Sequence, residues 1–413
     1  MGITRRFWPV PPCLPHGNYL ALDALRGPAL RKELSLLHFA KKADNPRRFP
    51  HRDRSTASHV PSPSLRTMQE RYILKQKTGV NGLGAGVWNL GPGGDPFGGP
   101  TRPAIPILDR LPLIAQAGMT YYEAHDVEIP AADAERAVKI AEDNGLKCAM
   151  YTPSFFADTI FKDGAMTSND PAIRAKALEN AKVAVDTTHA LGAGMMVFWN
   201  GREGFDFVLA KNGRDSFKRL VEGFNAVGQY AREKYGETIR FAIEPKPNEP
   251  RANMYLANVG EVLYLISRLD DDVRPIFGVN PETAHSRIAG LDYLWDVELC
   301  LEAGKLFHIH LNAQDGQRYD QDLPFGYTEP LKDLALLVVL QDARYQGPMC
   351  FDVKAPRTDD PKDIADILTV SANNLVWLWD RALAVDRSQI AAFRRENRAT
   401  SLSGYLARCL YGS

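Results

Sequence analysis

The chain has 413 residues, with 50 Lys and Arg against 50 Asp and Glu, and 45% of its residues are hydrophobic. This composition allows a large apolar core and excludes a chain that is disordered throughout. No apolar run approaches the roughly 20 residues that a membrane-spanning helix requires. The five cysteines are widely spaced and lack a CxxC pattern, which argues against a disulfide framework and a thiolate zinc site. We therefore expect an intracellular, cytoplasmic protein.

The first 67 residues differ from the rest of the chain. They hold 12 Lys and Arg against 4 Asp and Glu, a net charge of +8 that leaves −8 for residues 68–413 because the total is zero. Pro, Arg and Ser/Thr-rich stretches dominate this segment, so we expect a disordered tail. Three interpretations stay open: translation from too early a start, with Met68 as the natural first residue, an organelle-targeting presequence, or a genuine flexible tail.

From residue 82 onward, short apolar runs typical of strands alternate with longer stretches of helical period. The strand-like runs are 85–90, 119–125, 147–152, 195–199, 240–244, 276–280, 306–312 and 349–354. The helical stretches are 131–144, 172–191, 216–234, 259–269, 295–303, 331–343 and 362–384. Gly145, Gly192 and Gly304 follow three of these helices, where a C-cap is expected.

Eight repeated strand–helix units predict an α/β fold, a (β/α)8 TIM barrel over residues 68–360. The sequence favours this barrel over an open doubly wound sheet. Such a sheet usually carries a glycine-rich phosphate loop after its first strand, and this sequence has none there. No dinucleotide fingerprint is present either, so we expect no nicotinamide cofactor. Residues 361–413 are predicted to form a C-terminal helix and tail outside the barrel that contact another subunit.

Polar or aromatic residues stand where the predicted strands end, which is where a barrel carries its catalytic groups. In chain order they are Trp88, His125, Thr152, Trp199, Glu244 with Lys246, Glu282 with His285, His310 with Asn312, and Asp352 with Lys354. A single residue of this kind is usually structural. Eight strand ends that converge on one mouth indicate a functional site.

The carboxylates among these residues would repel one another unless cations compensated them. The oxygen and nitrogen donors are Glu244, Glu282, Asp352, Asp320, Asp322 and His285. An oxygen-rich set with one or two imidazoles suits Mg²⁺, Mn²⁺ or Co²⁺. Five carboxylates favour two metals over one, with Glu282 able to bridge them. The alternative is an acidic surface loop beside strand-end carboxylates that are paired with lysines.

Nine segments carry motifs in a fixed order across about residues 83–360. They are DPFGGPTRP (95–103), AHDVEIP (124–130), FKDGAMTSND (161–170), VFWNGREG (197–204), FAIEPKPNEPR (241–251), GVNPETAH (278–285), GKLFHIHLN (304–312), YDQDLPFG (319–326) and FDVKAPRTDD (351–360). In order and spacing they resemble the class I, short-form xylose (glucose) isomerases. The resemblance implies a homotetramer that isomerises D-xylose to D-xylulose, or D-glucose to D-fructose. The implied reaction is a 1,2-hydride shift on an open-chain sugar held by two divalent cations per subunit.

The resemblance also implies individual roles. A structural metal would be held by Glu244, Glu282 and Asp352. The catalytic metal would be held by Glu282, His285, Asp320 and Asp322. Lys246 would hydrogen-bond the substrate carbonyl oxygen, and His125 would assist ring opening. The sugar would lie against Trp88, Trp199, Thr152 and Phe156, with Phe97 reaching into the neighbouring subunit's site.

Two positions depart from the family pattern. His310 stands where the family has an aspartate that binds the structural metal; an imidazole can still coordinate, but the preference moves from Mg²⁺ toward Mn²⁺, Co²⁺ or Fe²⁺. Alternation along that strand places His308, His310 and Asn312 on one face. Glu128 stands where the family has an aspartate that orients His125, so we expect ring opening to be the step most affected.

Two other functions stay open. One is a related metal-dependent sugar epimerase or isomerase that acts by proton transfer, and the other is a catalytically lapsed sugar-binding barrel. The sugar itself is also open, because xylose, glucose, lyxose and ribose differ by one hydroxyl or one CH₂OH group. The negative net charge of residues 68–413 gives no support for a nucleic acid or a membrane as partner.

Overall fold

The computed structural model describes residues 82–93 and 98–412, and its centre is a ring of eight parallel strands. Around the ring they are β8 (Phe277–Val279), β6 (Arg240–Glu244), β4 (Met195–Trp199), β3 (Lys147–Thr152), β2 (Tyr121–His125), β1 (Leu83–Gly86), β10 (Met349–Phe351) and β9 (His310–Leu311). The bridges Val279↔Leu306 and Glu282↔His310 join the two ends of this order. The predicted (β/α)8 barrel is thereby confirmed. The predicted tail over 1–67, Met68 and Phe97 lie outside the described residues.

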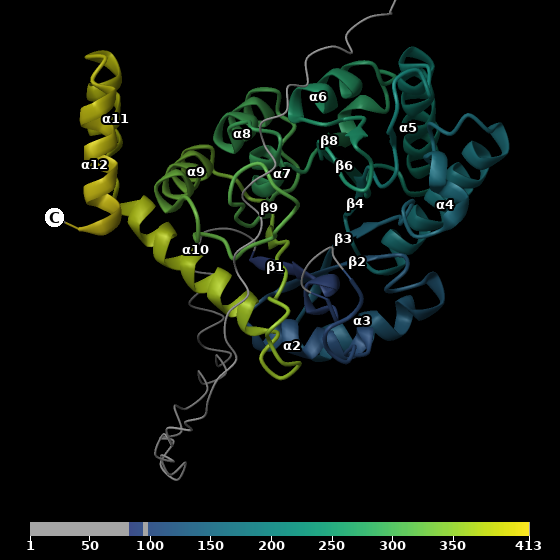
Figure 1. Ribbon diagram of the computed structural model, residues 1–413, viewed down its shortest axis with the longest axis horizontal. Coiled ribbons are helices and arrows are strands. Elements are labelled where there is room, and N and C mark those ends of the chain that lie inside the picture. Colours follow the sequence, from purple (N-terminus) through teal and green to yellow (C-terminus); the bar gives the residue numbers. More distant parts are fainter. Residues whose placement is uncertain (1–81, 94–97, 413) are drawn as a thin grey trace, which may run out of the picture. The chain divides into compact units, whose positions relative to one another are not determined.

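Helices surround the strands (Figure 1). They are α2 (Arg110–Gln116), α3 (Ala134–Asp143), α4 (Pro171–Ala190), α5 (Gly213–Tyr235), α6 (Val259–Ser267), α7 (Thr283–Ile288), α8 (Tyr293–Glu302) and α9 (Pro330–Asp342). Gly145, Gly192 and Gly304 follow α3, α4 and α8 with φ of 68°, 67° and 64°. These left-handed conformations confirm the three predicted glycine C-caps.

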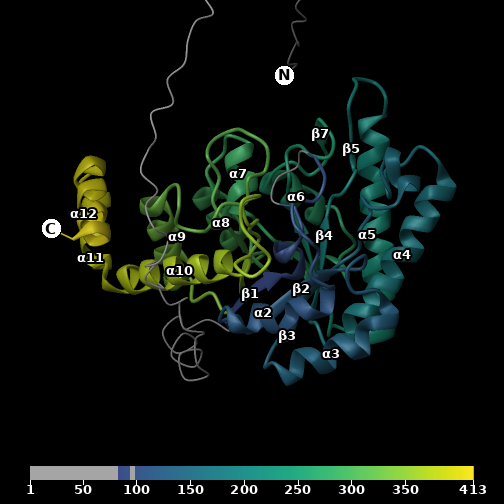
Figure 2. The same cartoon turned by 60° about the horizontal axis from the view of Figure 1, so that its bottom comes forward.

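The strands are buried on both faces, which explains why the sequence shows continuous apolar runs such as MMVFW rather than strict alternation. Phe241 of β6 and Phe277 of β8 stack with ring centroids 4.7 Å apart. A two-stranded antiparallel ribbon of β5 (Gly204–Phe205) and β7 (Asn253–Met254) joins the loops that follow β4 and β6 (Figure 2). The ribbon therefore links two of the loops that border the strand ends.

The first strand is shorter than predicted. It ends at Gly86, and residues Val87–Leu90 form the 3-10 helix η1 instead of continuing the run 85–90. The chain turns here because the ring of Trp88 folds back over Gly86, where a Cβ atom would come within 2.2 Å of the indole. Trp88 therefore stands on the turn after the strand.

The run 306–312 is a regular strand only over β9, so the prediction of a full-length strand was wrong. The N–H groups of Phe307 and His308 both donate to the carbonyl of Val279, at 3.1 and 3.4 Å. Two donors on one acceptor shift the register, as in a β-bulge. The hydrogen bonding between β8 and β9 is consequently irregular.

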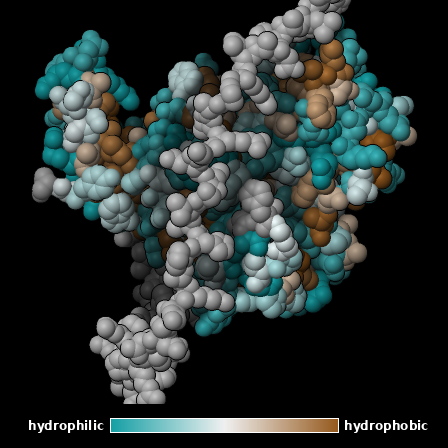
Figure 3. Space-filling model, in the orientation of Figure 1, coloured by the Kyte–Doolittle hydropathy of each residue, from teal (hydrophilic) through white to brown (hydrophobic). Residues whose placement is uncertain are grey.

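Three helices follow the last strand: α10 (Asp366–Ala384), α11 (Arg387–Arg395) and α12 (Ala399–Tyr411). Arg387 attaches α11 to α9 by donating to Asp342 and Gln341 at 2.8 Å each. In Figure 3 the hydrophobic residues of α11 and α12 gather on the side turned toward the barrel. The subunit contact expected for residues 361–413, and the homotetramer, stay predictions.

Over residues 82–93 and 98–412, none of the helices has the length and apolar character needed to cross a bilayer. The apolar helix α9 is packed into the fold, where Leu334, Leu337 and Leu340 are fully buried.

One buried carboxyl between helices predicts a pH-dependent stability. Asp333 of α9 accepts a 2.7 Å hydrogen bond from the hydroxyl of Tyr293 in α8, and burial raises the pKa of Asp333 from 3.8 to about 7. A raised folded-state pKa means that stability is lost as the pH rises toward 7. From pH 5 to pH 8 this group alone should lower the free energy of unfolding by about 2–3 kcal/mol.

We expect Asp333→Asn to remove this loss, because an amide oxygen still accepts from Tyr293 and carries no charge. Urea denaturation at pH 5 and pH 8 measures the difference. Asp143→Asn, an exposed change on α3, is the control. The interpretation is wrong if the variant and the parent lose the same stability between the two pH values.

Candidate active site

A cavity of about 360 Å³ opens where β2, β3, β4 and β6 end. Its lining includes nearly all of the predicted site residues that the structure describes: Trp88, His125, Glu128, Thr152, Phe156, Trp199, Glu244, Lys246, His285, His310, Asp320, Asp322 and Asp352. Glu282 is not part of the lining, but its carboxylate lies 3.2 Å from His285. The structure therefore brings the described members of the predicted site together.

Aromatic side chains form one wall of the cavity. The ring centroids of Trp88 and His125 are 4.5 Å apart, those of His125 and Phe156 are 5.7 Å apart, and those of Phe156 and Trp199 are 4.9 Å apart. The ammonium of Lys246 lies 5.5 Å from the ring centroid of Trp199. The wall thus runs without a break from the turn after β1 to the end of β4.

His125 is held by Glu128, the residue that departs from the family's aspartate. One carboxylate oxygen of Glu128 lies 3.2 Å from His125 Nδ1 and accepts the backbone N–H of His125 at 2.9 Å. The longer side chain of glutamate therefore reaches the imidazole. Burial lowers the pKa of His125, but the charge and hydrogen bond of Glu128 together with the charges of Asp352 and Glu244 outweigh it and leave the pKa raised.

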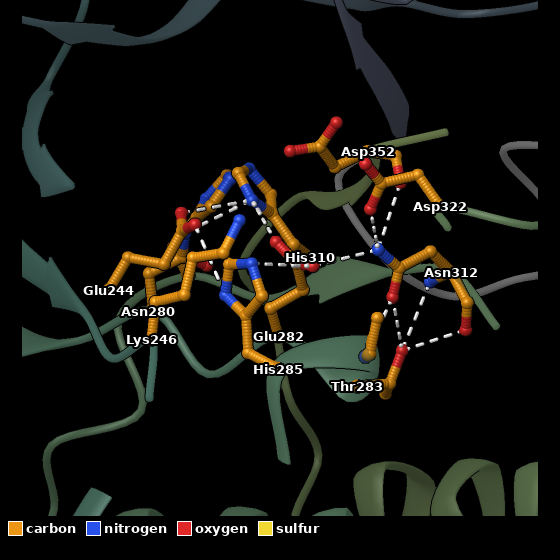
Figure 4. Close-up of polar contacts among 12 residues, drawn as sticks. Glu244, Lys246, Asn280, Glu282, Thr283, His285, His310, Asn312, Asp322 and Asp352 are labelled. Carbon is orange, nitrogen blue, oxygen red and sulfur yellow. Dashed lines mark hydrogen bonds and ion pairs between the residues drawn. The ribbon is translucent and has the colours of Figure 1, made fainter. Parts of the chain in front are cut away.

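Carboxylates and imidazoles converge at the strand ends (Figure 4). Several groups of three described residues bring their donor atoms within 4.8 Å of one another. Three of these groups contain Glu282: Glu282 with His310 and Asp352, Glu282 with Asp320 and Asp322, and Glu282 with Glu244 and His285. A further group is formed by Glu123, His308 and His310. The donors around Glu282 include all of the residues expected to hold two metals.

These residues fit divalent cations. Glu282 Oε2, Asp320 Oδ1 and His285 Nδ1 are buried atoms without a hydrogen-bond partner among the described residues. Leaving such a group unsatisfied costs about 1–3 kcal/mol, so three of them in one cluster fit the coordination of a cation. Carboxylate oxygens with imidazole nitrogens are donors suited to Mn²⁺, Co²⁺ and Mg²⁺.

The carboxylates differ in how easily they ionise. Burial, together with the charges of Glu244 and Asp320, raises the pKa of Glu282 to about 7. Burial and the charge of Asp320 also raise the pKa of Asp322 well above its ordinary value. Burial acts on Asp320 in the same direction, but Lys246 and His285 outweigh it and hold its pKa well below the usual range. A cation that binds here must therefore displace protons.

Two lysines neutralise part of this charge. Lys246 Nζ donates to Asp320 Oδ2 at 2.7 Å, and Lys354 donates to Asp322. Burial lowers the pKa of Lys246, but Asp320 and Asp322 outweigh it and raise the pKa above its ordinary value. Lys246 is therefore a buried, charged ammonium that lines the same cavity as the aromatic wall.

Asn312 is the amide that orients the carboxylates. Its Nδ2 donates to Glu282 Oε1 at 2.8 Å, to Asp322 Oδ1 at 2.9 Å and to the carbonyl of Asp352 at 2.9 Å. Both donor groups that include an aspartate are thus linked through one side chain, as Figure 4 shows.

Sequence reasoning missed Glu123 and Asn280. Asn280 follows β8 and donates to Glu244 Oε2 at 2.7 Å. Glu123 lies inside β2, fully buried, and contacts His308 and His310. The available signal was a glutamate within an apolar strand, since such a residue is rarely buried without a partner.

Comparisons with known proteins agree with this geometry. The family model described as a xylose isomerase-like TIM barrel matches residues 111–372. A xylose isomerase from Thermus thermophilus is 41% identical over 290 residues, which cover 68% of this chain and 74% of that protein.

Two solved structures share the fold. An L-ribulose 3-epimerase has a TM-score of 0.56 and 17% identity, covering 74% of this chain and 98% of its own. A D-psicose 3-epimerase crystallised in the presence of D-fructose has a TM-score of 0.53 and 16% identity, covering 72% and 97%. At these identities the similarity shows the fold alone.

Proposed function

Because the chain belongs to the xylose isomerase-like TIM barrel family, we propose that it is a metal-dependent aldose–ketose isomerase. The reaction converts D-xylose to D-xylulose, and D-glucose to D-fructose, by moving a hydride between C1 and C2 of the open-chain sugar. One observation carries the proposal. Donor groups that share Glu282 border the same cavity as an aromatic wall, with the charged Lys246 between them.

The residues present would hold two cations. The first position is formed by Glu244, Glu282, His310 and Asp352. The second position is formed by Glu282, His285, Asp320 and Asp322. When bound, the two cations supply Lewis acidity that offsets negative charge on adjacent sugar oxygens.

The other residues bind, orient and protect the sugar. Lys246 donates a hydrogen bond to the carbonyl oxygen, where its positive charge stabilises the charge that develops there. His125, oriented by Glu128, moves a proton at the ring oxygen when the cyclic sugar opens. Trp88 and Trp199 exclude water from the carbons that exchange the hydride.

The hydrogen bonds and ion pairs of the cavity's carboxylates favour a hydride shift over proton transfer at carbon. Proton transfer at carbon requires a base with a free lone pair, and a carboxylate is a common one. Each carboxylate among the described lining residues has at least one oxygen engaged: Glu128 by His125, Glu244 by Asn280, Asp320 by Lys246, Asp322 by Lys354 and Asp352 by the indole N–H of Trp88 at 2.7 Å.

The direct test uses the full chain, stripped with a chelator and assayed with D-xylose and D-glucose. We expect activity to return with Mn²⁺ or Co²⁺ more than with Mg²⁺, because His310 provides nitrogen rather than oxygen. D-Xylose labelled with deuterium at C2 should give xylulose that retains the label at C1. Loss of the label to solvent would favour the proton-transfer enzyme, and bound metal without turnover would contradict the isomerase.

The pair of His125 and Glu128 allows a prediction about a single step. We expect Glu128→Gln to lower the pKa of His125, because the neutral amide removes the charge that raises it. We also expect kcat with D-xylose to fall by about 10-fold, less than the 10²–10⁴-fold typical of a proton-transfer group itself, because Glu128 acts through His125. Histidine NMR titration and steady-state kinetics measure the two effects.

D-Glyceraldehyde separates ring opening from hydride transfer, because a three-carbon aldose cannot close into a ring. Its conversion to dihydroxyacetone should change less than twofold in Glu128→Gln. An equal loss with both substrates would show that the pair acts after ring opening.

A further inference from the structure

Glu123 is a buried carboxylate that the proposed chemistry does not use. It lies in β2 with no exposed surface, and its two oxygens contact the imidazoles of His308 and His310, at and just before β9. Glu123 Oε1 is 2.6 Å from His308 Nε2, and Glu123 Oε2 is 3.1 Å from His310 Nε2. Because β1 and β10 stand between β2 and β9 in the ring, this carboxylate reaches across the barrel interior.

We propose that Glu123 is a positioning residue that fixes the tautomer of His310, so that its Nδ1 lone pair faces the first cation position. The inference rests on the proposed function, since it assumes a divalent cation there. It concerns Glu123 and His308, to which the family resemblance assigns no role. Contacts at the two ends of the His310 ring support this role.

The first contact sets the position of the proton. An ionised carboxylate only accepts hydrogen bonds, so Glu123 requires an N–H on His310 Nε2. A neutral imidazole has one N–H, and Nδ1 is then left with a lone pair. Each oxygen of Glu123 lies within hydrogen-bond distance of one imidazole Nε2, which fits a carboxylate that accepts from two N–H groups.

The second contact sets the direction of the lone pair. His310 Nδ1 lies 3.1 Å from Glu244 Oε2 and 3.6 Å from Glu282 Oε2. Lone pairs this close repel unless positive charge lies between them. In this cluster that charge is a proton on Nδ1, the Nδ2–H of Asn280 at 3.3 Å from Nδ1, or a cation held by the same three side chains. A histidine that binds a metal through one nitrogen commonly donates its other N–H to a carboxylate.

His308 holds the carboxylate in place. Its Nε2–H occupies Glu123 Oε1, so the second oxygen is left for His310, and both contacts are fully buried. The contact with Glu123 also compensates for the negative charge that His310 lacks. His310 brings one negative charge fewer than a carboxylate at that position, and Glu123 supplies one on the far side of the same ring.

The test is Mn²⁺ binding to the full chain, measured by calorimetry and by counting bound ions. The parent should bind two Mn²⁺. In Glu123→Gln we expect one of the two affinities to fall by about 10–100-fold, as is typical when a ligand's supporting carboxylate is lost, and the other to change by less than threefold. Glu203→Gln is the matched control, because Glu203 is also buried but accepts from the backbone of Ala165, Met166 and Thr167.

A double-mutant cycle shows whether Glu123 acts through His310. In a His310→Asp background, Glu123→Gln should no longer weaken Mn²⁺ binding, because the tautomer that it controls is gone. The same loss in both backgrounds would show a merely structural role. A third Mn²⁺ in the parent would also overturn the inference, because it would place a cation where we place two N–H groups.

Nitrogen NMR of the parent keeps the proposal testable even if the variant fails to fold. With histidine labelled at nitrogen and the protein loaded with Mg²⁺, His310 should carry its proton on Nε2, and a proton on Nδ1 would refute the inference. None of these measurements uses turnover. Two bound Mn²⁺ with the expected losses, but no isomerisation of any sugar, would contradict the proposed function and leave the role of Glu123 intact.

Discussion

Glu282→Gln is expected to lower kcat/KM for D-xylose by at least about 10³-fold and to release both cations. The carboxylate belongs to both proposed cation positions, and it is buried with one oxygen lacking a hydrogen-bond partner. A neutral amide removes one negative charge from each position at once. A loss of 10³-fold corresponds to about 4 kcal/mol of transition-state stabilisation, which is a reasonable share for two cations.

Metal analysis after dialysis and steady-state kinetics test this prediction together. Glu302→Gln, the same change at an exposed position at the end of α8, is the control and should match the parent. Two Mn²⁺ bound to Glu282→Gln, with more than a tenth of the parent's activity, would show that Glu282 does not bridge the cations.

Lys246→Met is expected to separate catalysis from metal binding. We expect kcat to fall by about 10²–10³-fold, the usual effect of removing one donor to a developing oxyanion. Mn²⁺ should bind more tightly at the same time, because Asp320 loses the ammonium 2.7 Å away that now offsets its charge. This opposite pair of changes follows from the position of Lys246 between the carboxylates and the aromatic wall.

Kinetics and Mn²⁺ titration of the same preparation measure both effects. Lys139→Met, an exposed change on α3, is the control. If the affinity for Mn²⁺ falls along with kcat, then Lys246 supports the metal site rather than the sugar oxygen.

The sequence predicted the barrel and the cavity because both depend on local patterns. Apolar runs of strand length and glycine C-caps such as Gly145 located the repeated units. The parallel arrangement then required polar residues such as Glu244 and Thr152 to meet at one end. These inferences needed no knowledge of which strand faces which across the barrel.

What the sequence did not reveal depends on closure of the ring. Glu123 and His310 are 187 residues apart, so their contact follows from the order and tilt of strands that no local pattern specifies. The short β9 has a similar cause, because the double acceptance at the carbonyl of Val279 is set by how β8 meets its neighbour. The first strand ends before Trp88 because Gly86 leaves space for the indole ring. A hydrophobicity pattern does not show this packing effect.

The irregular pairing of β8 with β9 gives the proposed cations a second consequence. This joint is the seam where the barrel closes, and it is held by isolated bridges at Val279↔Leu306 and Glu282↔His310. The second bridge joins two of the residues proposed as ligands. An ion bound by both side chains would connect β8 to β9 across this joint. Metal binding would then stabilise the closed barrel as well as complete the catalytic site. Metal depletion would then expose the protein to unfolding from its catalytic end.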